Sequence, residues 1–468
     1  MWSPSRQLDW SFTPLEALLR WPGDRRVALL HSGRFHPRWA RWSILAEPIG
    51  AYQFVDRGEG KGEGRWIGDP DDCPVPVASL SERPFRDLRA LKHASRDGLW
   101  IGCLSYDLGR WVERLPSRAV DDRQWPIAEL GWCPGFLVYD GLLQRWLACG
   151  TWKEQLPFDL ASCTPRPESF HATDPVSTFT RPAYERTIAK AIDYIAAGDV
   201  FQANIAQRFT ADFLGSFPAA HRTLFTQLAQ GSPAWYGAYL ETADSPLPCR
   251  ERVAESARPG AGRDARPPDA CALEKSDAAG RFDAPLTPAL SLEGRGGRTR
   301  VIASTSPELF LQVDPHGHVV TRPIKGTRPG YVDPMELLRS EKDTAELNMI
   351  VDLLRNDLGR VCSYGSVQVE EARAIESHPT VHHGVATITG TLHPSRDIID
   401  LLRATLPGGS VTGAPKVRAM EIIDELEPVR RGPYCGTIGW LSKDSACFNI
   451  AIRTMLFDPS QERVDYSV

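Results

Sequence analysis

The residue in this sequence best suited to covalent chemistry is Lys325, within the heptapeptide Arg322-Pro-Ile-Lys-Gly-Thr-Arg328. An apolar segment before it predicts a strand, and Gly326 after it leaves the backbone bare enough for a ligand to approach. A lysine is a nucleophile only as an uncharged amine, which burial or a neighbouring cation such as Arg322, Arg328 or a metal favours. The alternative is a solvated turn lysine, and the heptapeptide alone favours that alternative.

A carboxylate is expected close to this lysine. Glu308 lies in a polar turn before a predicted strand that ends at Val313, and a second strand is predicted from Val319 to Ile324. A hairpin through residues 314–317 would pair these strands and bring Glu308 near Lys325. An acid and an amine that face one cavity can act as proton donor and nucleophile. A structural salt bridge is the alternative that spacing leaves open.

A predicted helix from Pro334 to about Leu354 carries a possible metal site. Asp343 and Glu346 are three residues apart and therefore share a helix face. Paired carboxylates suit Mg²⁺, which takes one or two protein carboxylates and leaves room for ligand and water. Such pairs are also common on solvated helices. The segment 355–357 is expected to end and cap this helix.

A glycine-rich segment, Gly408-Gly-Ser-Val-Thr-Gly-Ala-Pro-Lys416, precedes a predicted helix over Val417–Leu426. Pro415 suits the first helical turn, and bare N–H groups at a helix N-terminus form an anion site. The segment departs from the phosphate-binding pattern GxxxxGK[ST], because its glycine is separated from Lys416 and no Ser or Thr follows. A carboxylate therefore fits this predicted site better than a nucleotide does.

Two later segments place polar side chains in apolar surroundings. His382 and His383 lie in a strand-like run over residues 380–388, where a hydrogen-bonded core histidine is the usual outcome. A closing strand over residues 448–454 carries Arg453. An arginine in so apolar a strand needs an anion or a carboxylate as its partner.

Composition describes a globular chain with a large core. The 468 residues are 42% hydrophobic and 24% charged, and a net charge of −5 gives no nucleic-acid footprint. The ten cysteines form no CxxC pair and predict free thiols in a reducing compartment. No apolar leader opens the sequence and no run reaches membrane-spanning length, so a cytoplasmic location is expected.

Three regions are expected along the chain. Residues 1–150 alternate short apolar runs with Gly, Pro and Asp, which predicts a β-rich domain, and residues 151–176 read as a linker. A catalytic domain is expected over residues 177–468, and its first helix runs from Arg181 toward Gly198. Residues 244–300 lack apolar periodicity and predict a disordered insertion.

Four motifs then stand together in order: Pro323–Thr327, Ala345–Asp357, Gly408–Lys416 and Ile452–Thr454. With them the chain resembles the chorismate-utilising enzymes from about residue 8 to its end, apart from the insertion. The resemblance implies an α+β fold, with two packed antiparallel β-sheets flanked by helices, and an active site in the C-terminal half. It also implies that chorismate is the substrate and that a separate glutamine amidotransferase subunit supplies ammonia.

Two positions narrow the reaction that the resemblance implies. Relatives that form anthranilate carry alanine where Lys325 stands, and isochorismate-forming relatives carry a water-activating lysine about where Gln202 falls. This chain resembles the members that replace the C4 hydroxyl of chorismate with an amino group, on the way to p-aminobenzoate and folate. In that reaction Lys325 would add at C2 while Glu308 protonates the departing hydroxyl. Ammonia would then attack C4 and displace the lysine.

The same resemblance assigns the other site residues. Glu346 would bind Mg²⁺, with Asp343 close behind it, and the ion would neutralise a chorismate carboxylate. Substrate contacts are expected from five residues: Gly326, Thr327, His383, Tyr434 and Arg453. The place where relatives bind tryptophan matches Ser32, Pro233, Ala234 and Trp235.

Two departures from the family keep alternatives open. The insertion 244–300 is not a family feature, and relatives continue past Val468 into a glycine-rich loop and a helix with two more metal-binding carboxylates. The chain ending at Val468 is therefore expected to be truncated, with an incomplete metal site and little or no activity. The alternatives are a catalytically dead chain that still docks the amidotransferase, and a family member that forms anthranilate or isochorismate.

Overall fold

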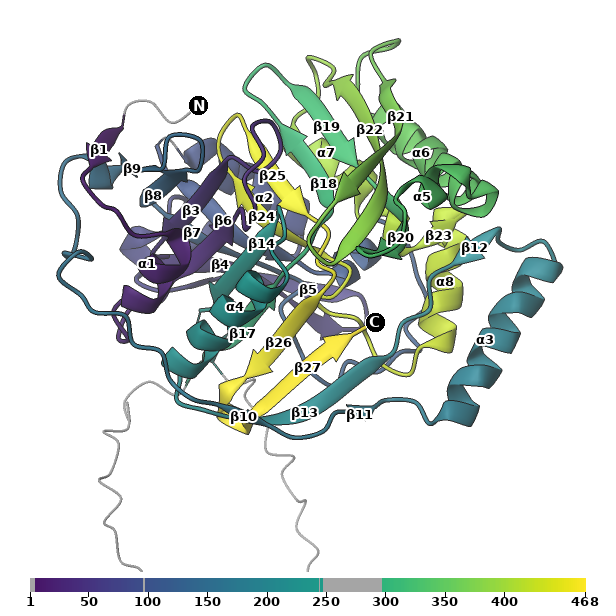
Figure 1. Ribbon diagram of the computed structural model, residues 1–468, viewed down its shortest axis with the longest axis horizontal. Coiled ribbons are helices and arrows are strands. Elements are labelled where there is room, and N and C mark those ends of the chain that lie inside the picture. The colour runs from purple at the N-terminus through teal and green to yellow at the C-terminus, as the bar shows by residue number, and fades with distance from the viewer. Residues whose placement is uncertain (1–4, 96, 244, 247–296) are drawn as a thin grey trace, which may run out of the picture.

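The structure is a computed structural model that describes residues 5–95, 97–243, 245–246 and 297–468. Two large antiparallel sheets flanked by helices form the molecule (Figure 1), which confirms the predicted α+β fold of two packed sheets. The predicted insertion, residues 244–300, falls almost entirely outside the described residues.

The strands of the first sheet, in spatial order, are β1 (Arg6–Leu8), β9 (Arg145–Gly150), β8 (Gly135–Asp140), β3 (Trp42–Ala46), β2 (Ala28–His31), β14 (Gly237–Glu241), β17 (Val301–Ser304), β26 (Thr454–Asp458), β27 (Arg463–Ser467), β13 (Arg208–Leu214) and β10 (His171–Ala172), and β11 (Val176–Ser177) also pairs with β13. Those of the second sheet are β20 (Ile324–Pro329), β22 (Val381–Thr391), β19 (His318–Arg322), β18 (Leu309–Val313), β25 (Ala446–Asn449), β24 (Thr437–Leu441), β6 (Leu99–Leu104), β7 (Ala128–Cys133), β4 (Gly50–Gly58) and β5 (Lys61–Ile67), and β21 (Gln368–Ser377) pairs with β22. Both sheets therefore combine strands from before residue 150 with strands from after residue 177.

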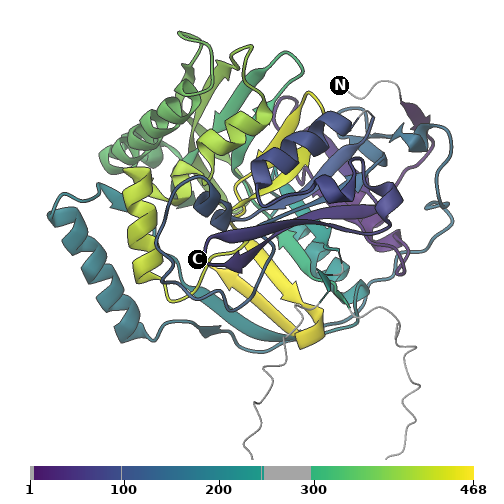
Figure 2. The ribbon, with the colours of Figure 1, turned by 180° about the vertical axis from the view of Figure 1, so that it is seen from behind.

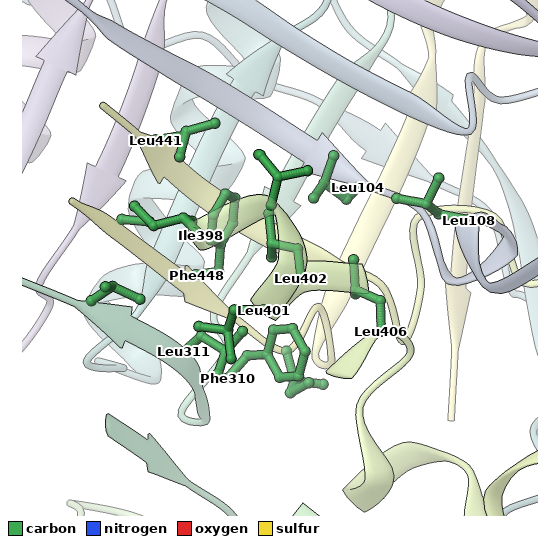
Figure 3. Packing of buried hydrophobic residues seen from close by; sticks show 14 of the residues in the cluster. Leu104, Leu108, Phe310, Leu311, Ile398, Leu401, Leu402, Leu406, Leu441 and Phe448 are labelled. Atoms are coloured by element: carbon green, nitrogen blue, oxygen red, sulfur yellow. The ribbon is translucent and has the colours of Figure 1, made fainter. Parts of the chain in front are cut away.

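One apolar core lies between the sheets and two more lie on their outer faces. Ile44 and Val138 of the first sheet pack with Ile101 and Ile438 of the second. The outer face of the first sheet is covered by α1 (Pro14–Arg20) and α4 (Ala219–Gly231), and that of the second by α2 (Pro84–Ala94), α6 (Glu341–Gly359) and α7 (Ile398–Thr405). In Figure 3, side chains of α7 gather against Phe310 of β18, two residues after Glu308.

The remaining helices lie around the second sheet and at the rim. α8 (Lys416–Leu426) follows β23 (Gly413–Ala414), a short strand that pairs with β12 (Gln202–Ala203). α3 (Arg181–Ala196) ends just before Gly198, as predicted, and lies at the rim of the molecule in both Figures 1 and 2. Ala191, at 7% exposure, is its one buried residue, so α3 is a peripheral element.

The helix predicted from Pro334 to Leu354 is two helices. α5 (Met335–Arg339) ends at Ser340, whose side chain accepts a hydrogen bond from the Asp343 N–H and so caps α6. α6 then continues to Gly359, so the expected end at residues 355–357 is wrong. Because Ser340 caps α6, it favours the start of a new helix at this point over one continuous helix.

The expected linker is part of the folded molecule. Residues 151–176 include Leu160, which is fully buried in the core beside α1, and the short strand β10. The eight described cysteines are all free thiols, in agreement with the prediction. No helix among the described residues combines the length and apolar character needed to span a membrane.

The ends of the predicted insertion are joined by strand pairing. Glu241 of β14 pairs with Val301 of β17, and the short strands β15 (Ser245–Pro246) and β16 (Gly297–Arg298) extend the same hairpin. We expect that replacing residues 247–296 with an Asn-Gly turn leaves the melting temperature unchanged or raises it, because the hairpin is already closed. Thermal unfolding of both chains checks this, and a large loss of melting temperature would show that the segment packs.

Candidate active site

Lys325 lies at an irregularity within β20. The pairing of β20 with β22 shifts register between Ile324 and Thr327, so Lys325 and Gly326 form a bulge rather than the expected turn. Gly326 has a φ of 84°, which glycine adopts without strain. A Cβ atom on Gly384 of β22 would lie 2.7 Å from the Lys325 carbonyl oxygen, so glycine permits this close approach. Bulges commonly re-aim a side chain at a functional site.

The predicted hairpin brings Glu308 beside this bulge. β18 pairs with β19, and Leu309 lies opposite Arg322. The turn between them is closed by a hydrogen bond from the Gly317 N–H to the Asp314 carbonyl oxygen, at the residues expected. Glu308 and the start of β20 therefore lie at the same end of the hairpin.

The Glu308 carboxyl is buried among few polar groups. Its side chain is 4% exposed, and burial raises its pKa to about 7. Hydrogen bonds from the Ser410 hydroxyl and the Ile324 N–H, together with the charge of Lys325, offset only part of this rise. Near neutral pH the group can therefore both release and take up a proton, and it lies close enough to Lys325 to interact with its charge.

This shift makes stability depend on pH. The folded chain holds the Glu308 proton to about pH 7, whereas the carboxyl has an ordinary pKa of 4.5. The native state therefore binds more protons between these values, and its free energy of unfolding falls as pH rises through them. Glu308→Gln has no carboxyl to titrate and so does not lose stability in this way. The difference in free energy of unfolding between Glu308→Gln and the parent should therefore shift in favour of the variant by up to about 3 kcal/mol from pH 4.5 to pH 8.

Urea unfolding of the parent and Glu308→Gln at pH 4.5 and pH 8 measures this difference. Glu336→Gln, at an exposed position on α5, is the control and should follow the parent at both values. Equal pH dependence of the parent and Glu308→Gln would contradict the buried protonated acid.

A histidine links two of the predicted substrate contacts. The Arg453 guanidinium lies 3.2 Å from His383 Nε2, and the Thr327 hydroxyl lies 2.9 Å from His383 Nδ1. Because a guanidinium only donates, Nε2 accepts and Nδ1 carries the proton toward Thr327. Burial, reinforced by the charge of Arg453, lowers the pKa of His383 to about 3, so the ring is neutral.

Arg453 keeps donors available for a ligand. It has a φ of 50°, and burial lowers its pKa. Among the described residues it forms no ion pair with a carboxylate, and its guanidinium donates to His383. An arginine held in this way suits an anionic group of a substrate.

Tyr434 lies in a segment close to Glu308. The N–H of Cys435 donates to the Ala451 carbonyl oxygen at 2.9 Å, and the N–H of Ile450 donates to the Glu308 carbonyl oxygen at 3.1 Å. Residues 434–436 and 450–451 therefore lie beside Glu308. Tyr434 is 9% exposed, and burial raises the pKa of its hydroxyl.

Comparison with known proteins places these residues in a family. A family model described as chorismate binding enzyme matches residues 62–248 and 289–468. The chain belongs to the chorismate-binding enzyme family. The match includes Lys325, Glu308, His383, Tyr434 and Arg453.

The sequences of individual relatives align with this chorismate-binding enzyme over most of their own length. Aminodeoxychorismate synthase component 1 of Escherichia coli K12 is 35% identical over 91% of this chain and 84% of its own. Anthranilate synthase component 1 of Thermus thermophilus is 31% identical over 93% and 84%. The crystal structure of anthranilate synthase component I from Streptococcus pneumoniae has the same fold, with a TM-score of 0.66 at 24% identity, over 98% of this chain and 92% of that one.

Asp343, one of the two carboxylates predicted for a metal, lies against the lysine bulge. A Cβ atom on Gly326 would lie 3.1 Å from Asp343, which places the first turn of α6 beside it. Asp343 accepts a hydrogen bond from Arg328 at 2.7 Å, and Glu346 lies 3.7 Å from the Lys342 ammonium. Within the described part of the chain, no three His, Cys, Asp or Glu side chains form a group suited to a metal ion.

The two arginines of the heptapeptide are engaged elsewhere. Arg322 pairs with Glu376 and also donates to Thr387 at 3.2 Å, while Arg328 pairs with Asp343. Carboxylates therefore neutralise both of the cations expected to act on Lys325.

The start of α8 differs from the prediction in the place of Pro415, and the anion site expected there stays a prediction. Lys416 is the first residue of α8 and is preceded by Pro415, which occupies the cap position. Its ammonium pairs with Asp357 and donates to the Thr405 carbonyl oxygen at 3.0 Å. Asp357, expected to cap a helix end, instead lies within α6 and holds this lysine. Burial makes such pairing necessary for the lysine charge.

The structure brings together the four residues predicted for tryptophan: Ser32, Pro233, Ala234 and Trp235. The Gly33 N–H donates to the Ala234 carbonyl oxygen at 2.7 Å, which joins the two segments. The Trp235 ring is 7% exposed and lies 5.3 Å from the His378 ring, which lies 5.5 Å from His383. This region therefore reaches His383, a predicted substrate contact, through His378.

Sequence reasoning missed Ser410 as a partner of Glu308. Ser410 belongs to the glycine-rich segment that was interpreted as an anion site. Nothing in the spacing of the two residues connects them, because the contact is made by chain segments far apart in the sequence. A buried serine beside a carboxylate could be recognised only after folding.

Proposed function

We propose that this chain converts chorismate and ammonia into 4-amino-4-deoxychorismate, as a step toward p-aminobenzoate and folate. The observation that carries the proposal is that Lys325, on a β-bulge, lies within charge range of Glu308, a buried acid whose pKa is raised to about 7. Relatives of this chorismate-binding enzyme that are named aminodeoxychorismate synthase component 1 support it, at 33–36% identity.

In the proposed reaction, the Lys325 amine attacks C2 of chorismate while the two ring double bonds shift. The C4–O bond breaks, and Glu308 donates the proton with which the hydroxyl leaves as water. Ammonia then attacks C4, the double bonds return, and the C2–N bond to Lys325 breaks. Glu308 regains a proton, and the products are 4-amino-4-deoxychorismate and water.

The remaining contacts would orient the substrate. Arg453 would bind a chorismate carboxylate, and neutral His383 would hold the guanidinium and the Thr327 hydroxyl in place. The bare backbone at Gly326 would allow the ring to approach Lys325, and Tyr434 would line the opposite wall. Holding reactants in line in this way accounts for much of an enzymatic rate enhancement.

Asp343 and Glu346 are proposed to hold Mg²⁺. Their hard oxygen donors on one helix turn suit the ion, which keeps several waters and needs only one or two protein carboxylates. Bound there, Mg²⁺ would neutralise a carboxylate of chorismate. Asp343 would exchange part of its contact with Arg328 for the ion.

A glutamine amidotransferase subunit is proposed as the source of ammonia, and the cytoplasm as the location, in keeping with the free thiols of the described cysteines. Two alternatives remain distinct outcomes of the test. One is a family member with another product, anthranilate or isochorismate. The other is a catalytically dead chain that retains only its docking surface.

Product identification tests the proposal. The chain is incubated with chorismate, Mg²⁺ and ammonium, and the products are identified by mass spectrometry and NMR. 4-Amino-4-deoxychorismate supports the proposal, and anthranilate or isochorismate would overturn it in favour of a relative's reaction. Chorismate binding by calorimetry without any product would identify the dead chain.

A further inference from the structure

A loop of residues 408–411, here called the Ser410 loop, packs directly on Glu308. A Cβ atom on Gly408 would lie 2.6 Å from the Ile450 side chain, and the Ile450 N–H donates to the Glu308 carbonyl oxygen. Ser410 is 6% exposed, and its hydroxyl hydrogen-bonds the Glu308 carboxylate. The loop therefore contacts the side chain of this acid through Ser410 and packs on Ile450, which bonds its backbone.

Asn204 holds the Ser410 loop from the other side. Its side-chain amide donates to the Ser410 carbonyl oxygen at 2.7 Å, and its N–H donates to the Thr412 carbonyl oxygen at 2.9 Å. Gln202 donates to the Asn204 side-chain oxygen at 3.1 Å, which fixes the amide orientation. Backbone and side chain of Asn204 thus bind the loop on both sides of Val411.

A buried ion pair ties these segments together. Arg431 and Glu427 have side chains that are 3% and 4% exposed, and two hydrogen bonds of 2.6 and 3.0 Å join them. Arg431 also donates to the carbonyl oxygens of Val411, at 2.8 Å, and Asn204. Glu427 accepts from the Ala206 N–H at 2.8 Å. One pair therefore fixes the loop and the Asn204 segment against each other.

Stability alone is a weak reason for such a pair. Removing two charges from water costs several kcal/mol per ion, and apolar residues of similar volume often stabilise as well or better. A rigid, many-bonded pair does fix backbone positions. We propose that Ser410 is a positioning residue for Glu308, and that the Arg431–Glu427 pair, acting with Asn204, holds the Ser410 loop in place for this role.

Ser410→Ala gives the direct test, and the catalytic part of the proposal rests on the proposed function. The Ser410 hydrogen bond favours the ionised form of Glu308, so its loss should raise the pKa of that carboxyl above about 7. The alkaline limb of kcat should move to higher pH. We expect kcat to fall by about 10- to 100-fold with KM unchanged, because the acid is misplaced while the substrate contacts remain.

Three further variants sharpen the test. Ser410→Thr keeps the hydroxyl and should restore the parent pH limb. Asn204→Ala removes the side-chain bond to the loop without a buried charge, and should lower kcat in the same way as Ser410→Ala. Thr405→Val removes a hydroxyl that bonds only within α7, so its pH limb should match the parent.

A direct titration separates this inference from the proposed reaction. The Glu308 carboxyl is followed by ¹³C NMR of glutamate-labelled chain without substrate, and Glu308→Gln assigns its signal. A higher pKa in Ser410→Ala supports the inference, and a parent-like pKa together with parent-like kcat would overturn it. The shifted carboxyl in a chain that forms no aminodeoxychorismate would overturn the proposed function and leave Ser410 assigned to Glu308.

Discussion

Lys325→Ala is expected to abolish amination of chorismate at C4. In the proposed reaction the lysine amine forms the bond to C2 that expels the C4 hydroxyl, and alanine offers no nucleophile for this step. The loss should be at least about 100-fold, the lower end of what one positioned catalytic group contributes. The measurement is aminodeoxychorismate formation from chorismate and ammonium at saturating Mg²⁺.

Lys61→Ala is the matched control. Lys61 is 70% exposed on β5, at the opposite edge of the second sheet from β20, and its removal should leave the rate unchanged. Mass spectrometry of the parent trapped during turnover should show an adduct on Lys325. Normal amination by Lys325→Ala, with no lysine adduct under any trapping condition, would refute a covalent role.

Glu308→Gln is expected to lower kcat by about 10²- to 10⁴-fold, the usual contribution of a general acid. Glutamine keeps the size of the side chain but has no proton to give to the departing hydroxyl. In the parent, kcat should fall as pH rises through about 7, because Glu308 then loses the proton it donates. The residual activity of Glu308→Gln should lack this decline.

Glu129→Gln is the control for this pH dependence. Burial also raises the pKa of Glu129 to about 7, but its side chain bonds Gln53 and the Ala243 N–H, in a part of the second sheet that holds none of the proposed site residues. Its replacement should leave the alkaline limb of kcat in place. A limb near pH 7 that survives in Glu308→Gln would assign the proton donation to another group.

Local patterns predicted individual elements, and the family resemblance predicted the fold class. Short apolar runs separated by Gly, Pro and Asp predicted strands, and the resemblance carried by the four motifs implied two packed antiparallel sheets, as observed. The β18–β19 hairpin was also predictable, because a strand, a polar turn at residues 314–317 and a second strand follow each other directly. Such features depend on residues close together in the chain, where propensity and turn chemistry act.

The predictions from sequence were wrong where a side chain forms a hydrogen bond or ion pair that the sequence pattern does not reveal. Asp357 was interpreted as a helix cap, yet it lies within α6 and holds the buried Lys416. Ser340 divides one expected helix into two. In each case a hydrogen bond or ion pair outweighed the average preference of the residue.

The sequence by itself was enough to predict which residues would carry the chemistry. The glycine beside Lys325 and the hairpin that holds Glu308 predicted these two, and the family motifs predicted the contacts around Arg453. Only the tertiary structure decided the electrostatics and support of the site, because burial of Glu308, the His383 tautomer and the Ser410 loop depend on segments far apart in the chain. Desolvation and hydrogen bonding depend on which groups are close together in the folded chain, and the spacing of residues in the sequence does not predict that proximity.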